Sequence, residues 1–353
     1  LFTAIVISRL LIDLVVSKNG KLTFNTVISK NWFKSLDFDF LKKRKVFYII
    51  SSTVILFGIG SLFTNGLNYG VDFKGGRNYL VKFDHNMKAD EVASSLKVIY
   101  GSSPEVKTFG DDSQLKITTK YRIDEEGQEI DEDVQLKLFT GLSKHLPKDM
   151  TYEDFKGGFD GQKYGIMSQI KVEPTIADDI KASSGWAIFG SLLVIFLYIL
   201  FRFKKWQFSF GATVALFHDI LIVISVFSLF YKVLPFDMEV DQAFIAAILT
   251  VLGYSINDTV IIFDRIREYL GLHPSWTFED VINKGLSSTL ARTINTAGTT
   301  LVVLFAIFLF GGDSIKGFTF ALIVGIVVGT YSSIFVASPI MYDLTKKLDK
   351  KKK

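Results

Sequence analysis

Six long apolar stretches divide the chain, and polar or charged segments separate each from the next. The stretches are 46–65, 185–201, 207–231, 242–263, about 289–310 and 317–342. At about 1.5 Å per residue, a helix of roughly 20 residues crosses the ~30 Å hydrocarbon core of a membrane. The pattern therefore predicts a polytopic α-helical membrane protein with six full transmembrane helices.

A further apolar run opens the chain at 1–16, but it is short for a span and contains Arg9 and Asp13. A signal peptide carries its positive charge before its apolar stretch, which this run does not. We expect 1–16 to be the last turns of a partial seventh membrane helix, so that the chain is part of a longer polypeptide. The polar and aromatic segment 17–44, which ends in LKKRK, is expected to be a cytoplasmic linker.

A hydrophilic module, 67–182, follows the first span, which takes up 45–66. Alternating apolar residues predict strands at 78–84, 105–109, 114–121 and 165–172, and helical spacing predicts helices at 89–100 and 131–146. The order β-α-β-β-α-β is that of a ferredoxin-like α+β domain. The other five spans are expected to form a bundle at 183–345, followed by a basic cytoplasmic tail at 346–353.

Charge is segregated along the chain. Hydrophobic residues make up 49% of the 353 residues, charged residues make up 22%, and the net charge is +4. Basic residues cluster on one side of the predicted spans, which the positive-inside rule assigns to the cytoplasm: 42–45, 202–205, 265–267, Lys284 and 346–353. The other side carries the hydrophilic module and the acidic residues Asp237, Glu239, Asp241 and Asp313. The small net charge therefore indicates membrane orientation and not nucleic-acid binding.

Several chemistries find no support in the sequence. Cysteine is absent, which excludes disulfides and thiolate metal sites, and only four histidines are present. We find no HExxH motif, no Walker-type GxxxxGK[ST] and no nucleophile with a base at motif spacing. We therefore expect no catalytic residue, no metal and no cofactor, and we do not expect an enzyme.

Two charges lie inside predicted spans. Asp258 is seven residues from Arg265, and Arg292 is seven from Gly285, so each lies about 10 Å from the same interface. A carboxylate deep in a bilayer costs about 2.5–3.5 kcal/mol on insertion scales and usually faces the protein interior. In an antiparallel helix pair the two charges could face each other. The alternatives are a structural polar contact for Asp258 and snorkelling to the headgroups for Arg292.

Other polar residues in the spans extend this candidate ion pathway. Asn257 shares a helix face with Asp258, and Thr296 shares one with Arg292, so the two stripes either line a hydrated path or bond across packed helices. His218 and Asp219 lie near the middle of their own span. They are either a proton relay or a buried interhelical hydrogen bond.

A glycine-rich motif and a proline motif flank the hydrophilic module. In GVDFKGG the residues of interest are Gly70, Asp72, Gly75 and Gly76, and we expect the glycines to permit the turn into the module. Pro174 and Thr175 are expected to shape the return into the membrane. Both motifs are interpreted as structural.

The chain resembles the SecD/SecF family of bacterial protein-export membrane proteins. The resemblance rests on GVDFKGG at 70–76, VEPTIADDI at 172–180, HD at 218–219, ILTVLGYSINDTVIIFDRIRE at 248–268 and TLARTINTAGTTL at 289–301. Together these motifs cover a SecF-type unit from about 37 to 344. Residues 1–16 resemble the end of the last SecD helix, which implies a fused SecDF.

The resemblance implies an accessory subunit of the SecYEG translocon in the inner (cytoplasmic) membrane, which uses the proton-motive force to promote late stages of preprotein export. It also implies an RND-like helix bundle, because the family resembles the resistance-nodulation-division transporters. Asp258 and Arg292 match two essential membrane charges, and the third, an aspartate of the SecD half, has no counterpart here. The implied partners are the SecD half, SecYEG, a YajC-like small subunit, the translocating preprotein and the lipid bilayer. The alternatives are a small-molecule or lipid exporter and a translocon scaffold that transports nothing.

Overall fold

The computed structural model describes residues 6–17, 38–102, 104–125, 127–157, 164–312 and 315–351. The chain divides into two compact units, one ending at Phe38 and the other beginning at Asp39. In the first unit, α1 (Ser8–Ser17) is a short helix within the predicted partial span. Most of the predicted linker, Asp313 and the last two residues of the basic tail lie outside the described residues.

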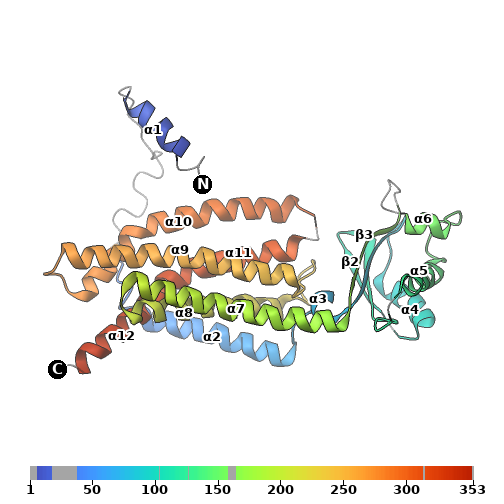
Figure 1. Ribbon diagram of the computed structural model, residues 1–353, viewed down its shortest axis with the longest axis horizontal. Coiled ribbons are helices and arrows are strands. Elements are labelled where there is room, and N and C mark those ends of the chain that lie inside the picture. Colours follow the sequence, from blue (N-terminus) through green and yellow to red (C-terminus); the bar gives the residue numbers. More distant parts are fainter. Residues whose placement is uncertain are drawn as a thin grey trace. The chain divides into compact units, whose positions relative to one another are not determined.

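Six helical segments of the described chain are long and apolar enough to cross a membrane. Five are single helices, namely α2 (Arg44–Thr64), α7 (Pro174–Phe203), α8 (Trp206–Phe230), α9 (Gln242–Leu272) and α10 (Phe278–Phe310). The sixth span combines α11 (Lys316–Ser332), the π-helical turn η4 (Ser333–Ala337) and α12 (Ser338–Lys351). The predicted multi-pass helical fold is confirmed, and Figure 1 shows α9 and α10 running side by side.

Helices α9 and α10 are longer than the apolar stretches that predicted them. They have 31 and 33 residues, or about 46–50 Å of helix against a hydrocarbon core of about 30 Å. Thr277 begins α10 with a side-chain cap that accepts a hydrogen bond from the Asp280 amide at 3.1 Å. The helices extend beyond the predicted span limits at 263 and 289 because hydropathy locates the edge of the hydrocarbon, whereas helical hydrogen bonding continues beyond it.

Small residues let α11 lie close against α9. A Cβ atom on Gly325 would clash with Val251, and one on Gly329 would lie 2.9 Å from the Cβ of Ser255. Ser333 continues this stripe one turn later. Residues four apart lie on one helix face, so the stripe forms the close helix packing that is frequent in membrane bundles.

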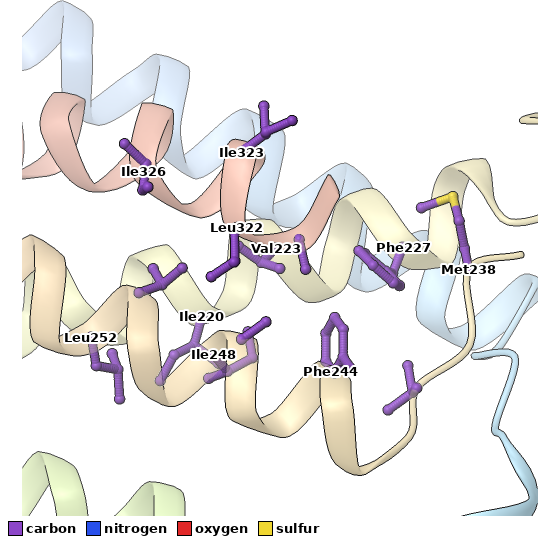
Figure 2. Close-up of a cluster of buried hydrophobic side chains, with 14 of the residues drawn as sticks. Ile220, Val223, Phe227, Met238, Phe244, Ile248, Leu252, Leu322, Ile323 and Ile326 are labelled. Atoms are coloured by element: carbon purple, nitrogen blue, oxygen red, sulfur yellow. The ribbon is translucent and has the colours of Figure 1, made fainter. Parts of the chain in front are cut away.

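Apolar side chains from α8, α9 and α11 fill the core of the bundle (Figure 2). Phe227 of α8 packs on Phe244 of α9 with ring centroids 4.5 Å apart. Leu322 and Ile326 of α11 belong to the same buried cluster. These three helices therefore form the rigid centre to which the other spans attach.

The hydrophilic module is an α+β domain with one four-stranded sheet. The strands are β1 (Gly76–Lys82), β2 (Glu105–Phe109), β3 (Asp111–Thr119) and β4 (Gly165–Val172), in the order β2-β3-β1-β4 with every pair antiparallel. Its helices are α3 (Val71–Lys74), α4 (Ala89–Tyr100), α5 (Gln128–Leu142) and α6 (Tyr152–Lys156). Figure 1 shows α4 and α5 on one face of the sheet, as in the predicted ferredoxin-like fold.

Two short helices of this domain, α3 and α6, were not predicted. The five residues of α6 are too few to show a helical period, and they depend on a capping box in which Thr151 and Asp154 exchange hydrogen bonds. Phe155 of α6 is fully buried in the domain core. The short helix therefore closes the core beneath the start of β4.

Candidate functional site

Asp258 lies in the middle of α9 and is almost completely buried. Only 1% of its surface is exposed. Neither carboxylate oxygen has a hydrogen-bond partner among the described residues. Since buried polar groups are nearly always hydrogen-bonded, an aspartate with two unsatisfied oxygens is a candidate functional residue.

Arg292 lies on the neighbouring helix α10 but does not form an ion pair with Asp258 within 4 Å. Two contacts define how these antiparallel helices align: the Tyr254 and Thr300 hydroxyl groups lie 3.3 Å apart, and Gly285 packs on Ile266. Between these two contacts, Asp258 of α9 lies at about the level of residues 293–296 of α10. Arg292 therefore lies slightly nearer than Asp258 to the Gly285 end of the helix pair. Arg292 is exposed on α10.

Asn257 and Thr296, which were also predicted to border the pathway, lie on the same two helices as these charges. Asn257 is exposed, and the Thr296 hydroxyl donates to the Arg292 carbonyl oxygen at 2.9 Å. Thr293, which the sequence did not single out, is buried at the level of Asp258, and its hydroxyl also lacks a described partner. Asp258 of α9 and Thr293 of α10 are thus both buried polar residues whose side-chain oxygens have no described partner.

His218 and Asp219 of α8 form the centre of a hydrogen-bonded hub between helices. His218 Nδ1 lies 3.1 Å from Asp219 Oδ1. The hydroxyls of Ser255 on α9 and Ser332 on α11 donate to Asp219 Oδ2 at 2.8 and 2.9 Å. His218 Nε2 also bonds to the Ser51 hydroxyl of α2 at 3.0 Å. One aspartate thus joins α8 directly to α9 and α11, and reaches α2 through its neighbouring histidine.

Sequence reasoning missed the serines of this hub. Small hydroxyl residues within apolar spans are common, so Ser255 and Ser332 carry no signal singly. The spacing of Gly325, Gly329 and Ser333 at four-residue intervals is a signal that could have identified the face of α11 that meets α9. It could not have identified Asp219 as the acceptor.

The glycine-rich motif joins the external domain to the bundle. The Gly70 amide donates to the Val240 carbonyl at 3.1 Å, and Asp72 accepts a hydrogen bond from the Gln242 amide at 3.0 Å. Both contacts attach the motif to the start of α9. The motif therefore holds the end of the helix that carries Asp258.

The two glycines that end this motif permit its turn. Gly75 and Gly76 have positive φ angles of 67° and 141°, which favour glycine. A Cβ on Gly75 would lie 3.1 Å from the Cα of Pro174. Pro174 is the first residue of α7, where proline is well tolerated, and Thr175 is exposed in the same turn.

A second cluster of charges lies between the sheet and the α8–α9 loop. Lys116 of β3 donates to Asp237 at 2.9 Å and to Glu239 at 2.6 Å, and Lys107 of β2 lies 3.5 Å from Glu239. Burial and the neighbouring Asp237 raise the pKa of Glu239. Burial by itself lowers the pKa of Lys116, but the carboxylates outweigh it and raise that pKa. The cluster borders a cavity of about 380 Å³ and clamps the domain onto the bundle.

Among the described residues, no group of three or more His, Asp or Glu side chains is arranged to hold a metal ion.

Family models match two parts of the chain. Residues 154–347 match the protein export membrane protein SecD/SecF, C-terminal model, and residues 60–87 match the SecD/SecF GG motif. The second match contains Gly75 and Gly76, and the first contains Asp219, Asp258 and Arg292.

Curated relatives and solved structures agree with these models. The protein translocase subunit SecF of Rhodothermus marinus is 43% identical over 313 residues, which cover 88% of this chain and 94% of that protein. The SecF subunit of Haemophilus influenzae is 35% identical and is covered over 86% of its length. The crystal structure of SecDF, a translocon-associated membrane protein from Thermus thermophilus, has a TM-score of 0.78 at 25% identity. The match covers 98% of this chain but only 43% of that protein. On these matches, the chain belongs to the SecD/SecF family of protein-export membrane proteins.

Proposed function

We propose that the chain is a proton-motive-force-coupled accessory subunit of the Sec translocon, which promotes late stages of preprotein export. Family membership supports the association with export, because the relatives are named protein translocase subunits. The observation that supports the coupling is the buried Asp258 carboxylate, whose two oxygens have no partner in the described chain. We propose a mechanical role and no enzymatic one.

In this proposal Asp258 binds and releases a proton as hydration of the site changes. A carboxylate with no permanent hydrogen bonds can gain or lose a proton without dismantling a network. Arg292 supplies a positive charge that favours the ionised form, and Asn257 and Thr296 border the path. One charge crossing 100 mV supplies about 2.3 kcal/mol, and Asp72 attaches the start of α9 to the external domain, which gives this energy a route to that domain.

The partner of this site is proposed to be the SecD half, in the same or an adjacent chain. The polar groups of α9 and α10 that are exposed in the described chain would be costly against lipid: Thr250, Asn257, Arg292, Asn295 and Thr299. Gly253 and Gly298 on these helices have open space beside them, which allows close approach of another helix. The 43% share of the SecDF chain that this chain matches is consistent with such a half.

The remaining partners and the location follow from the same proposal. The bundle crosses the bacterial inner membrane, and the basic ends of the helices lie in the cytoplasm. The ferredoxin-like domain lies on the extracytoplasmic side, where it meets the emerging preprotein. SecYEG and a YajC-like small subunit are the proposed membrane partners.

The test is preprotein export into membrane vesicles, with and without an imposed proton gradient, in which Asp258→Asn replaces the parent. We expect the gradient to stimulate the parent and to leave the variant unstimulated at equal abundance. Asp264→Asn is the matched control, because Asp264 lies on the same helix but its carboxylate is paired with Arg202 and Arg267. If all three proteins respond alike to the gradient, Asp258 is structural, and the chain acts as a translocon scaffold that transports nothing.

A further inference from the structure

A continuous chain of hydrogen bonds leads from Asp219 toward the Arg44 end of α2. Asp219 bonds to His218 Nδ1, and His218 Nε2 lies 3.0 Å from the Ser51 hydroxyl. The Ser51 hydroxyl lies 3.0 Å from the Tyr331 hydroxyl, which donates to the Phe47 carbonyl at 3.3 Å. Phe47 lies in the first turn of α2. The chain thus joins the buried centre of the bundle to one of its ends.

The inner end of this chain lies next to Asp258. Ser255 donates to Asp219 and is three residues from Asp258 on α9. Side chains three apart on a helix have Cβ atoms about 5–6 Å apart, so a single water molecule is enough to connect the two side chains. Thr259, one turn from Ser255, bonds to the Ser255 carbonyl at 3.2 Å and adds a second hydroxyl beside Asp258.

We propose that this chain is the proton exit of the coupling site: Asp258, Ser255, Asp219, His218, Ser51 and Tyr331 pass protons in that order. The inference rests on the proposed function, and it assigns Ser51 and Tyr331 a role in proton transfer. The exit runs through the α2, α8 and α11 side of the bundle. It is separate from the exposed polar side chains of α9 and α10, which we assign to proton entry.

The transfer conserves protons at every step. Asp258 releases its proton through water to Ser255, whose own proton moves to Asp219. The proton arrives on Asp219 Oδ2, which accepts from Ser255, and rotation of the carboxyl group brings it to the side of His218 Nδ1. Nδ1 takes the proton, the Nε2 proton moves to Ser51, the Ser51 proton moves to Tyr331, and the Tyr331 proton leaves to water. One proton enters and one leaves. Rotation of the hydroxyls, of the carboxyl group and of the imidazole ring resets the chain.

The burial of these groups supports a directed path. Asp219 and Ser255 are at most 1% exposed, and His218 is 6% exposed, whereas Tyr331 is half-buried at the outer end. Exposure thus increases along the chain from its centre to its exit. Another hydroxyl contact between α2 and α8, Ser61 with Ser228 at 2.8 Å, continues to the Gly66 carbonyl and to the Asn65 side-chain amide, and none of these groups bonds to His218 or Asp219.

That contact supplies the matched control. The experiment measures gradient-driven proton uptake with a trapped pH-sensitive dye, in vesicles where each variant replaces the parent chain beside its native partners. Tyr331→Phe removes only the hydroxyl and keeps the ring that packs on Phe335. Ser51→Ala breaks the link to His218, Ser51→Thr restores a hydroxyl, and Ser61→Ala removes a buried hydroxyl between the same two helices.

We expect Tyr331→Phe and Ser51→Ala to slow proton uptake at least about tenfold, because a lost proton-transfer group costs roughly 10²–10⁴ where its step limits the rate. Ser51→Thr should recover most of the rate, and Ser61→Ala should match the parent. If Asp258→Asn stops uptake while Tyr331→Phe and Ser51→Ala match Ser61→Ala, the exit path is refuted and the proposed function stands. If Asp258→Asn transports like the parent, the proposed function fails and the exit path fails with it.

Discussion

Asp219 and Asp258 are the same residue type, both almost fully buried in one helical bundle, yet their surroundings are opposite. Asp219 accepts hydrogen bonds from two serine hydroxyls and pairs with His218. Asp258 has no described hydrogen-bond partner for either oxygen. Burial alone therefore does not define the role of an intramembrane carboxylate. The partners decide whether the carboxylate is held in a hydrogen-bonded network between helices, as Asp219 is, or has no described hydrogen-bond partner, as is the case for Asp258.

The largest expected effect is the difference in stability between a variant that lacks the Asp219 carboxylate and one that lacks the Asp258 carboxylate. Asp219→Ala leaves His218, Ser255 and Ser332 without their acceptor, and breaking such a buried set should lower the free energy of unfolding by about 3 kcal/mol. Asp258→Ala removes no hydrogen bond and should change it by less than about 1 kcal/mol. Thermal unfolding of both variants in detergent checks this, and equal losses would contradict the contrast.

A smaller difference in stability is expected when a methyl group is added on either side of α9. One side packs on α11, and the other has open space beside Gly253. Gly325→Ala places a methyl group against Val251 on the closed side and should cost about 2 kcal/mol by overpacking. Gly253→Ala on the open side meets nothing within 4 Å and should be neutral or slightly stabilising in the isolated chain. The same thermal unfolding measurement applies. A destabilising Gly253→Ala would show that this side of α9 is already packed.

The comparison with Asp258, which lacks a described partner, extends to a buried charge of the α+β domain that is well hydrogen-bonded. Arg77 is 2% exposed and bonds to Asp131 and to the carbonyls of Tyr121 and Arg122. Asp131→Asn should destabilise the domain by about 1–2 kcal/mol, allowing for the partial exposure of Asp131. Hydrogen exchange of the β1 amides in the full chain measures this change.

The same aspartate predicts a pH dependence. Burial alone raises the pKa of Asp131, but hydrogen bonds from Arg77 and Lys171 outweigh it and lower that pKa. Because the folded pKa lies below the unfolded value of about 3.9, the contribution is complete above that pH and is lost as the pH falls through the folded pKa. The acid-induced rise in β1 exchange should therefore be shallower in Asp131→Asn than in the parent. Identical slopes would contradict this assignment.

The smallest effect is expected at the junction between the domain and the bundle. Lys116→Met leaves Asp237 and Glu239 close together with only Lys107 to balance them. Exchange of the Val240 amide, which donates to the Asn68 carbonyl at 2.7 Å, should report a loss of about 1 kcal/mol. Added salt should reduce the difference, since it screens the repulsion. Lys88→Met is the control, because Lys88 lies away from this cluster before α4.

Local patterns predicted the regular elements well. Helix 89–100 and the strands 105–109 and 165–172 have the predicted bounds in the structure, because alternation and helical spacing are properties of neighbouring residues. The predicted helix 131–146 begins and ends earlier, at 128 and 142. Its ends depend on caps and on burial against the sheet, which are not local properties.

For the candidate site, composition and spacing by themselves determined that the protein crosses a membrane and that Asp258 and Arg292 lie within its helices, because an apolar run of sufficient length has few other stable environments. Which of the buried charges has partners depends on how the helices pack in three dimensions. Ser51, Ser255 and Ser332 come from three helices far apart in the sequence, and they meet at His218 and Asp219 because glycines and serines allow those helices to approach closely. A single sequence does not encode that meeting as a pattern, since each helix would have the same local appearance wherever its neighbours lay.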